Sequence, residues 1–591
     1  MQPAAPRSDS ADRKTNREVA QFLDRIAMLL EARGESPFRV RAYREAAAHI
    51  EAMSQGLVAL WKAGALQTIT GVGPSIAAKV DEWLRTGHSA YLDELQRSVP
   101  VGIEQLMSIP GIGPSRARAL IKHLNVHTPE ELAIAAENHA LQQLPGFGAR
   151  SEERILVEAR RWSQREKRLL LGVAWPIAER VIDLLRTNPI FRQVSAAGSL
   201  RRMRETIGDI DLLAASDTPA AAVDAFARLP IIREVLARGP TKASVLLESG
   251  LQVDLRVVEP GSWGAALQYF TGSKLHSITL RDIAIGMGLK LNEYGVYREA
   301  TGRRVGGETE ADVYHALGME WIPPELREDR GEIQAAETHR LPVLVERADL
   351  TGDLHVHSSW SDGTAGIEAM AVAARAVGLS YIAITDHSPS LSIANGLTPE
   401  RLQQQRQEID TLNARLAPFR IYQGSEVDIR PDGTLDLPDA VLARLDYVSV
   451  SVHSRFHMGS DDMTGRIIRA IRNPFVNTLN HPTGRLIDRR PGYDVDLEAV
   501  LRVAASQRVA VEINSQMQRL DLDDVWSRRA KELGCQLVVD SDAHGPAHYG
   551  VLRYGIAVAR RGWLTSANVV NTLPRPAFDK WLQLRRGQRA A

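Results

Sequence analysis

Residues 198–211 of the chain read GSLRRMRETIGDID, and an apolar run follows as far as Ala214. The run predicts a β-strand, and Asp209 and Asp211, two residues apart, place their carboxylates on one face of it. A second strand-like run, 252–257, carries Asp254 and can bring a third carboxylate alongside. Clustered carboxylates repel one another unless cations neutralise them, so the pattern predicts bound divalent metal ions, Mg²⁺ or Mn²⁺.

The turn before this strand completes a pattern that suits phosphoryl transfer from a nucleotide. Gly198 and Ser199 offer a backbone amide and a hydroxyl that can approach a triphosphate, and Arg202 is near enough to add positive charge. Two metal ions at the carboxylates would activate a hydroxyl nucleophile and stabilise the leaving pyrophosphate. An isolated Asp-x-Asp is commonly a solvated strand edge, and the Gly-Ser turn upstream is what favours a metal site.

The part of the chain after residue 350 contains a second group of potential metal ligands. It comprises His355, His357, Asp362, Asp386, His387, Glu426, His453, His481, Asp542 and His544. A single histidine is usually structural or exposed, but several of these follow short apolar runs that are typical of strands. Imidazole and carboxylate ligands without cysteine favour Zn²⁺, Mn²⁺ or Fe. Because the ligands outnumber what one or two ions need, we expect three metals and hydrolysis of a phosphate ester.

A short motif occurs three times in the N-terminal part of the chain. The copies are Ile69–Ala77, Ile109–Ala117 and Leu144–Ser151, and each places Gly-x-Gly after an apolar residue and before an amphipathic helix. The glycines are Gly71, Gly73, Gly111, Gly113, Gly146 and Gly148. Backbone N–H groups at such a helix N-terminus can receive a phosphate. The repetition favours DNA-backbone binding over the alternative, a purely structural helix hairpin.

Composition restricts the class of protein but not its reaction. The chain has 591 residues, which indicates several domains, and its 72 Lys and Arg balance 72 Asp and Glu. A net charge of zero argues mildly against nucleic-acid binding, although the basic stretch 150–168 can hold a phosphate backbone. A single cysteine, Cys535, excludes an intramolecular disulfide and a thiolate metal cluster. Without a signal peptide or a membrane-length apolar run, we expect a cytoplasmic protein with no membrane contact.

Hydrophobic periodicity divides the chain into segments of different fold class. Residues 17–90 predict helices, because apolar residues from Val19 to Leu30 recur at three- and four-residue spacing. Short β-like runs separated by helices over 170–320 predict an α/β or α+β domain. Residues 321–348, with the pair Pro323-Pro324 and many charges, predict a linker. Repeated strand–helix units then predict a barrel of parallel strands with functional residues at the strand C-termini.

Residues 198–211 resemble the palm of family X DNA polymerases, the group that contains DNA polymerase beta. The segment Tyr269–Ser273 resembles their sugar-contacting segment, and 291–296 continues the match. The resemblance implies that Asp209 and Asp211 hold both metals, and that Asp254 binds the catalytic metal and helps to deprotonate the primer hydroxyl. The implied nucleotide-binding residues are Gly198, Ser199, Arg202, Tyr269, Phe270, Gly272 and Ser277, and Arg256 is assigned to DNA binding. Ser277 replaces an asparagine that touches the base in the beta enzyme.

The resemblance extends to the N-terminus, where Phe38–Tyr43 and 71–82 are similar to the lyase domain of the beta enzyme. Lys79 falls where the lysine that forms a Schiff base lies, which implies a lyase activity at a 5′-phosphate. Arg39 and Ser75 replace neighbouring phosphate-binding lysines. A lysine at this place is also what an exposed helix face would carry.

Residues 353–358, Thr385–His387 and Ser541–His544 resemble the polymerase and histidinol phosphatase (PHP) domain. The resemblance implies a distorted (β/α)7 barrel that holds three divalent metals, Zn²⁺ or Mn²⁺. The implied ligands are His355, His357, Asp362, His387, Glu426, His453, His481, Asp542 and His544. Asp353 and Asp386 are expected to orient those ligands.

These resemblances give a multidomain fold, with helical N-terminal domains, an α+β nucleotidyltransferase palm with a thumb, and the barrel. The expected order is a disordered tail at 1–16, a lyase-like domain at 17–90, a helix-hairpin-helix domain at 91–168, a palm at 169–260, a nucleotide-binding polymerase subdomain at 261–320, a linker at 321–348 and a PHP domain at 349–578.

The order of segments predicts a monomeric repair enzyme that binds gapped or primer–template DNA and dNTPs. It would fill short gaps by two-metal nucleotidyl transfer, and the barrel would act as a 3′–5′ exonuclease or 3′-end phosphoesterase, with apurinic-site endonuclease activity as a further option. Three alternatives stay open. The barrel could be a structural scaffold, the chain could be a nucleotidyltransferase for a non-DNA substrate, or it could be a non-enzymatic DNA-binding adaptor.

Overall fold

The computed structural model describes residues 16–588 except 54–56, 87–88, 108, 110, 145 and 166–167. The chain divides into two compact units, one ending at Arg168 and the other beginning at Leu169. The predicted tail, 1–16, lies outside the described residues apart from Asn16, which begins the first helix. Pro110 and Pro145 of the repeated motif also lie outside them.

The N-terminal unit is helical, as predicted. Its first half contains α1 (Asn16–Arg33), α2 (Pro37–Ala52), α3 (Leu57–Lys62), η1 (Leu66–Thr68), α4 (Pro74–Thr86) and α5 (Ala90–Arg97). Its second half contains α6 (Ile103–Met107), α7 (Pro114–Leu124), α8 (Pro129–Glu137), η2 (Leu141–Gln143) and α9 (Ala149–Arg165). The apolar residues that predicted the first helix, among them Leu23, Ile26 and Leu30, are fully buried in the core between α1 and its neighbours. The two halves have separate hydrophobic cores.

The three copies of the glycine motif adopt the same local structure. Gly71, Gly111 and Gly146 have φ angles of 81°, 89° and 86°, a left-handed conformation that L side chains rarely adopt. The second glycine of each copy is followed at once by α4, α7 or α9. All six glycines are exposed, so the turn at each helix N-terminus is open to a ligand.

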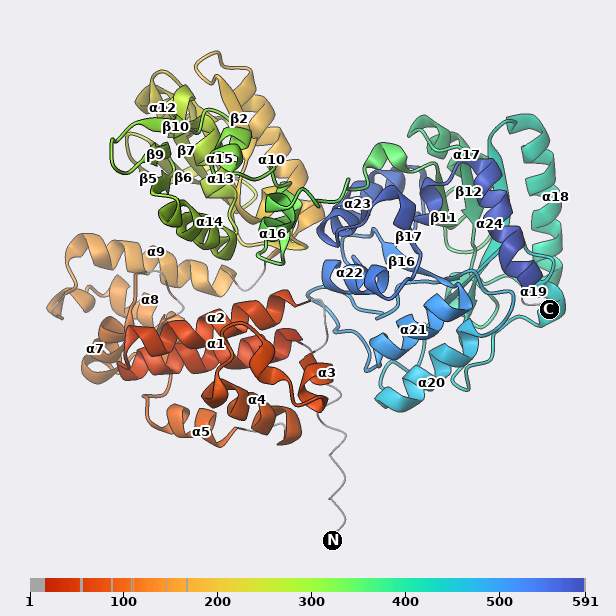
Figure 1. Cartoon of the computed structure of the whole chain (residues 1–591), viewed down its shortest axis with the longest axis horizontal. Helices are drawn as coiled ribbons and strands as arrows, with labels where there is room; N and C mark the ends of the chain where they lie inside the picture. Colours follow the sequence, from red (N-terminus) through yellow and green to blue (C-terminus); the bar gives the residue numbers. More distant parts are fainter. Residues whose placement is uncertain are drawn as a thin grey trace, which may run out of the picture. The chain divides into compact units, whose positions relative to one another are not determined.

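The second unit begins with a five-stranded mixed sheet, in the order β2-β4-β7-β6-β5. Figure 1 labels β2, β5, β6 and β7 of this sheet. Its strands are β2 (Gln193–Ala196), β4 (Ile210–Ala215), β5 (Ile232–Arg238), β6 (Lys242–Leu247) and β7 (Gln252–Val258). The associated helices are α10 (Leu171–Arg186), α11 (Gly198–Arg201), α12 (Pro219–Ala227), α13 (Trp263–Thr271) and α14 (Lys274–Gly286), and the two-residue strands β1 (Leu169–Leu170) and β3 (Thr206–Ile207) pair separately. Strands β4 and β7 are parallel, and their register places Asp211 directly beside Asp254.

A small three-stranded sheet, β10-β9-β8, follows the mixed sheet. It consists of β8 (Leu289–Asn292), β9 (Gly295–Arg298) and β10 (Arg304–Gly306), and α15 (Glu310–Ala316) comes next. The prediction of a linker at 321–348 is wrong. This segment contains η4 (Pro324–Leu326) and α16 (Glu332–Glu337), and it buries Ile322, Leu326 and Ile333 in the same core as the small sheet. Its charges misled the prediction because Arg327 and Glu332 are themselves buried.

The rest of the unit is a barrel of seven parallel strands, β11 to β17 in sequence order. The strands are β11 (Gly352–Val356), β12 (Tyr381–Ile384), β13 (Arg420–Asp428), β14 (Tyr447–Ser451), β15 (Thr478–Leu479), β16 (Ala510–Asn514) and β17 (Leu537–Asp540). The longer helices are α17 (Ile367–Ala376), α18 (Pro399–Leu416), α20 (Ser460–Ile471), α21 (Leu497–Gln507), α22 (Asp524–Glu532), α23 (Leu552–Arg561) and α24 (Arg575–Gln588), with the short α19 (Asp439–Leu442). The connections η3 (Pro260–Ser262), η5 (Arg347–Asp349), η6 (Ser392–Ala394), η7 (Pro546–Val551), η8 (Ser566–Asn568) and η9 (Val570–Thr572) complete the unit.

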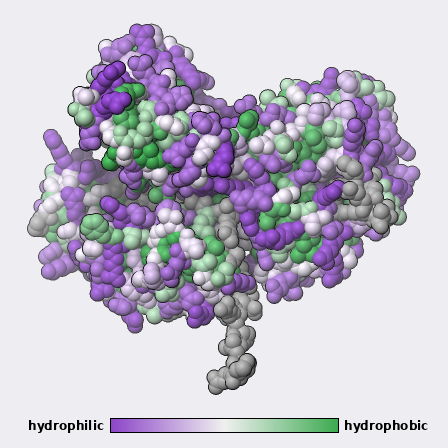
Figure 2. Space-filling view, in the orientation of Figure 1, coloured by the Kyte–Doolittle hydropathy of each residue, from purple (hydrophilic) through white to green (hydrophobic). Residues whose placement is uncertain are grey.

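A parallel bridge between Val356 and Ala543 brings the two ends of the barrel sheet together, so the barrel is nearly closed, as the sequence predicts. The strands are buried except at Arg420, the half-buried first residue of β13, which is typical of parallel strands covered by helices. Among the described residues no helix is long and apolar enough to cross a membrane. Figure 2 shows hydrophilic residues over most of the visible face, with only scattered hydrophobic patches.

Candidate active sites

The three predicted carboxylates meet at one end of the mixed sheet. Oxygen atoms of Asp209, Asp211 and Asp254 lie within 4.8 Å of one another. Asp211 and Asp254 are neighbours across β4 and β7, and Asp209 stands one residue before β4. Asp209 is exposed and the other two are half-buried, so the cluster is open to substrate.

The electrostatics of this cluster favour a bound cation. Burial, with the nearby charges of Asp209 and Asp254, raises the pKa of Asp211 to about 7. Lys242 and Arg202 oppose this rise but do not cancel it. The Lys242 Nζ lies 3.6 Å from Asp254 Oδ2, and Gln252 donates a 2.9 Å hydrogen bond to the same carboxylate. A divalent ion would relieve the repulsion among three carboxylates, so the residues fit the predicted metal.

The Gly-Ser turn packs directly against the carboxylates. Gly198 has a φ of 57°, and a Cβ at this position would overlap the carboxylate of Asp211. Only glycine therefore lets α11, with half-buried Ser199, begin this close to the metal ligands. Arg202 follows α11 and donates through Nη1 to the carbonyl oxygen of Thr271.

The predicted sugar-contacting residues lie at the end of α13. The rings of Tyr269 and Phe270 are 5.1 Å apart, edge to face, and Tyr269 is 36% exposed. The guanidinium of Arg256 lies 5.2 Å from the centre of the Phe270 ring, and Gly272 turns the chain beside Arg202. Ser277 differs: it is buried within α14, and its hydroxyl has no hydrogen-bond partner among the described residues. This placement does not support Ser277 as a contact to the base.

The structure brings the nine predicted barrel ligands together at the C-terminal ends of the strands. His355 lies in β11 and His357 just after it, His387 follows β12, and Glu426 lies in β13. The other ligands are His453 after β14, His481 after β15, Asp542 and His544 after β17, and Asp362 in the loop after β11. Eight of the nine form three overlapping groups, which are His357, Asp362, His387 and His544; His355, His357 and Asp542; and His387, Glu426 and His453. The ninth, His481, contacts Glu426.

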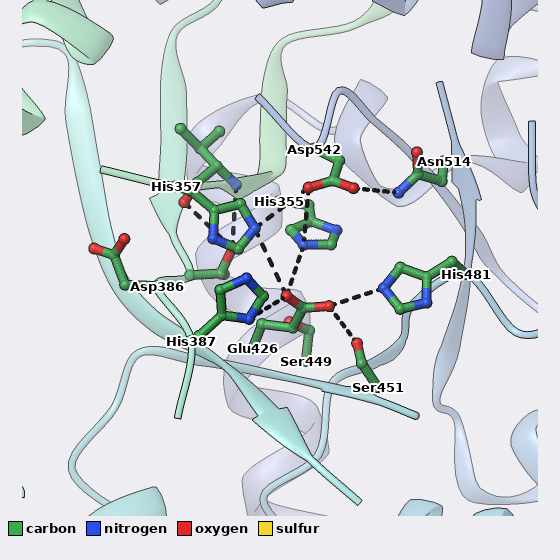
Figure 3. A network of polar contacts seen from close by, with 12 residues as sticks. His355, His357, Asp386, His387, Glu426, Ser449, Ser451, His481, Asn514 and Asp542 are labelled. Carbon is green, nitrogen blue, oxygen red and sulfur yellow. Dashed lines mark hydrogen bonds and ion pairs between the residues drawn. The ribbon is translucent and has the colours of Figure 1, made fainter. Parts of the chain in front are cut away.

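Glu426 is the centre of the cluster (Figure 3). Its Oε2 lies 3.4 Å from His355 Nε2, 3.6 Å from His357 Nε2 and 3.0 Å from His387 Nδ1. Its Oε1 lies 2.9 Å from His481 Nε2 and 3.4 Å from His453 Nε2. One carboxylate thus faces five imidazoles, an arrangement suited to a carboxylate that bridges metal ions.

Two further carboxylates, Asp542 and Asp362, complete the cluster. Asp542 Oδ1 lies 3.3 Å from His357 Nε2 and 3.6 Å from His355 Nε2. Asp362, one-third exposed, lies 3.4 Å from Nε2 of both His387 and His544. Asp362 therefore belongs to the cluster and marks its more open side.

The hydrogen bonding of the buried histidine ring nitrogens shows whether this cluster is suited to hold metal ions. His355 Nε2 and both ring nitrogens of His357 are buried without a hydrogen-bond partner among the described residues. Burial and the charges of His387 and His544 lower the pKa of His357 to about 3, which keeps its imidazole neutral, the form that binds a metal. Buried polar atoms without partners are costly, so the histidine and carboxylate groups fit divalent ions.

Several residues that the sequence analysis missed hold the ligands in place. Glu512 accepts at 2.6 Å from His355 Nδ1 and at 2.5 Å from the backbone N–H of His481. Asn514 donates at 3.0 Å to Asp542, and Asp428 lies 2.9 Å from His453 Nδ1. A signal for Glu512 was present, because it is the one charged residue in the apolar run 509–513.

The two predicted orienting acids act on the backbone and on serine. Asp353 accepts from the backbone N–H groups of His355 and Ser541, which fixes the ends of β11 and β17. Asp386 accepts at 2.8 Å from the backbone N–H and at 2.6 Å from the hydroxyl of Ser358, directly after His357. Both carboxylates thus hold strand ends that carry ligands.

Lys79 lies on α4 in the N-terminal unit, after the first glycine motif. Its Nζ donates to Ser75 Oγ at 3.0 Å and lies 4.5 Å from the centre of the Tyr91 ring. Partial burial and the nearby charge of Arg39 lower the pKa of Lys79, against the opposing effect of Glu82. A lowered pKa is what a lysine nucleophile requires.

Family models match four segments of the chain. A helix-hairpin-helix domain matches residues 14–89, a SAM-like helix-hairpin-helix tandem matches 103–161, a DNA polymerase beta thumb matches 266–328 and a PHP domain matches 353–516. The thumb model ends within the segment that the sequence analysis took for a linker, in agreement with the packing of that segment.

Similar proteins cover either most of the chain or about a third of it. The DNA polymerase/3′-5′ exonuclease PolX of Bacillus subtilis is 40% identical over 558 residues, which is 94% of this chain and 97% of that protein. A probable phosphatase of Thermoanaerobacter sp. is 32% identical over 205 residues, 33% of this chain and 79% of that protein. A probable phosphatase of Syntrophotalea carbinolica is 30% identical over 204 residues, 34% of this chain and 78% of that protein.

Proposed function

We propose that this chain both extends and shortens DNA 3′ ends. The chain belongs to the bacterial family X DNA polymerases that carry a C-terminal PHP domain. It fills short gaps as a DNA polymerase at the carboxylate cluster and acts as a 3′–5′ exonuclease or 3′-end phosphoesterase at the barrel cluster. The single observation that carries this proposal is the presence of two separate ligand clusters of different chemistry in one unit.

At the carboxylate cluster, Asp209, Asp211 and Asp254 hold Mg²⁺ or Mn²⁺, which would supply charge stabilisation for transfer of a nucleotidyl group. Asp254 accepts the proton of the primer 3′-hydroxyl. Ser199 and Arg202 hold the triphosphate, and Arg202 is already oriented by Thr271. Tyr269 and Phe270 support the sugar of the incoming nucleotide.

At the barrel cluster, the nine ligands hold three divalent ions, Zn²⁺ or Mn²⁺, which would supply an activated water and neutralise a phosphate ester. Glu512 and Asn514 keep His355 and Asp542 in the orientation that binding requires. Asp362 and His544, the more exposed ligands, face the side from which a phosphate ester would enter.

The glycine turns support DNA as the common substrate of both sites. Three exposed Gly-x-Gly turns at helix N-termini can each bind a phosphate of a DNA strand without reading its sequence. The net charge of zero does not oppose this role, because these contacts use backbone N–H groups rather than side-chain charge.

A labelled primer next to a short gap tests the proposal. With dNTPs and a divalent metal, the wild-type chain should extend the primer to the end of the gap. Without dNTPs, it should shorten the same primer from its 3′ end, and a chelator should stop both reactions. Extension without shortening would leave the barrel as a scaffold, and a failure to extend any DNA primer would favour a nucleotidyltransferase for another substrate.

A further inference from the structure

A buried chain of arginines and carboxylates leads from the carboxylate cluster to the barrel. It begins at Arg202, passes through Glu328, the last residue that the thumb model matches, and reaches Arg561 at the end of α23. From there it continues to Asp524, the first residue of α22, and to Arg330. The five side chains come from four parts of the sequence that lie more than 300 residues apart at the extremes.

Each link in this chain is short. Arg202 Nε lies 3.1 Å from Glu328 Oε1, and Arg561 Nη1 lies 2.9 Å from the same oxygen. Arg561 Nη2 and Arg330 Nη1 both lie 2.8 Å from Asp524 Oδ2. The side chain of Arg561 is 3% exposed, so these contacts are shielded from solvent and from salt.

Glu328 is charged because several guanidinium groups surround it. Burial alone would raise its pKa, but Arg561, Arg202, Arg204 and Arg330 outweigh burial and hold the pKa well below the usual range. These four arginines share two carboxylates, Glu328 and Asp524, so the network keeps a net positive charge beside the predicted triphosphate site.

Arg561 also holds the backbone of the nucleotide-binding turn. Its Nη1 donates at 2.8 Å to the carbonyl oxygen of Arg202, the residue that follows α11. The barrel thus contacts both the backbone and, through Glu328, the side chain of the same residue. Arg202 uses Nε for Glu328 and Nη1 for Thr271. Its Nη2 has no hydrogen bond within the part of the chain that the structure describes, so this nitrogen can meet a phosphate oxygen.

We propose that Arg561 of the barrel is a positioning residue for nucleotide binding, which acts through Glu328 and the Arg202 backbone to aim Arg202 at the triphosphate. The inference rests on the proposed function of Arg202. Arg561 competes for Glu328 and so keeps this carboxylate from neutralising Arg202 fully. Without Arg561, Glu328 would lose one of its two contacts of about 3 Å and pair with Arg202 and the more distant Arg204, and the turn would lose a backbone anchor.

The test compares Arg561→Gln with the wild-type chain in steady-state gap filling. We expect the KM for dNTP to rise about tenfold, with a smaller change in kcat, because Arg202 is misoriented before the nucleotide binds. Glu328→Gln, on the polymerase side of the contact, should also raise the KM. Arg561→Lys, which keeps one charge and one contact, should restore part of the loss. Hydrolysis by the barrel should stay within about twofold of wild type in all three.

Arg553→Gln is the matched control. Arg553 lies on the same helix, α23, and its Nη2 lies 2.7 Å from Glu179 of α10, but this pair is exposed and does not connect to Arg202. Its KM should stay within about twofold of wild type. An unchanged KM in both Arg561→Gln and Glu328→Gln, or an equal rise in Arg553→Gln, would overturn the inference. A wild-type chain that fails to fill gaps would instead overturn the proposed function.

Discussion

The carboxylate cluster and the barrel cluster differ in how much of each metal site the protein itself supplies. The first has three ligands on one side of a sheet, with Asp209 exposed. The second has nine ligands from all around a barrel, and His355 and His357 are fully buried. Three carboxylates leave several coordination positions of two Mg²⁺ ions unfilled, whereas histidine and carboxylate groups enclose the barrel site.

This difference shows two ways of organising metal chemistry in one chain. The open cluster is completed by the nucleotide, so its ions should arrive with substrate. The barrel cluster is organised before substrate arrives, since Glu512, Asn514 and Asp428 already hold its ligands. The two sites should therefore respond separately to substitution.

The largest effect is expected for Asp211→Asn. Asp211 contributes to both predicted metal positions and touches Gly198 of the nucleotide-binding turn, so single-turnover extension should fall at least about 1,000-fold. Shortening of the same primer should stay within about twofold of wild type. A comparable loss of hydrolysis would break the separation between the two clusters.

Glu310→Gln tests the ion pair between α15 and α11, the helix that begins beside the carboxylate cluster. Arg201 forms two 2.7 Å contacts with Glu310, and Arg327 lies 2.6 Å away, so these arginines overcome burial and lower the pKa of Glu310 to about 2. Since the folded pKa is below the unfolded value, this stability is present above about pH 4.5 and is lost as the pH falls towards 2.

At pH 7 the substitution should cost about 3 kcal/mol in the free energy of local opening of α15. Hydrogen exchange with mass spectrometry, corrected for intrinsic rates, would measure this loss. The difference in opening free energy between Glu310→Gln and the wild type should become smaller towards pH 3. If this free-energy difference were the same at pH 7 and pH 3, the lowered pKa of Glu310 would be contradicted. Exchange in β16 of the barrel provides the internal control.

Glu512→Gln sharpens the description of the barrel site. Glu512 contacts the His355 ring and the His481 backbone but is not among the predicted ligands, so hydrolysis should fall about 10- to 100-fold, with weaker metal retention. Extension should be unaffected. Wild-type hydrolysis in this variant would show that the ligands do not need this support. Metal content measured after desalting gives a readout independent of activity.

The smallest effect on gap filling is expected for Lys79→Ala. Lys79 belongs to neither cluster, so extension should change less than about threefold, while borohydride trapping on abasic DNA should disappear. Lys62→Ala, on α3 of the same unit, is a control for the loss of one positive charge. Trapping that survives in Lys79→Ala would remove the lyase role and leave the two clusters as the catalytic sites.

The sequence predicted those features that depend on short-range periodicity. Asp209-x-Asp211 follows from the two-residue period of a strand, and the glycine turns follow from the position of Gly-x-Gly before each helix. The barrel ligands could be found because parallel strands end at one rim, so residues far apart in sequence meet there.

Features that depend on long-range packing were missed. The segment 321–348 looks like a linker because its charges and prolines suit solvent, yet Arg327 is paired with Glu310 and Glu332 is hydrogen-bonded to His276, both from other elements. Ser277 occupies the expected position in sequence, but the packing of α14 buries it. The contact between Arg561 and Arg202 joins residues 359 positions apart, and no local pattern indicates it.

The most direct measurement follows the length distribution of a 5′-labelled primer in the presence of dNTPs for three chains: Asp211→Asn, His357→Ala and the double variant. Asp211→Asn should only shorten the primer, His357→Ala should only extend it, and the double variant should leave it unchanged. If either single variant lost both reactions while hydrogen exchange showed both domains folded, the two clusters would not be separate active sites.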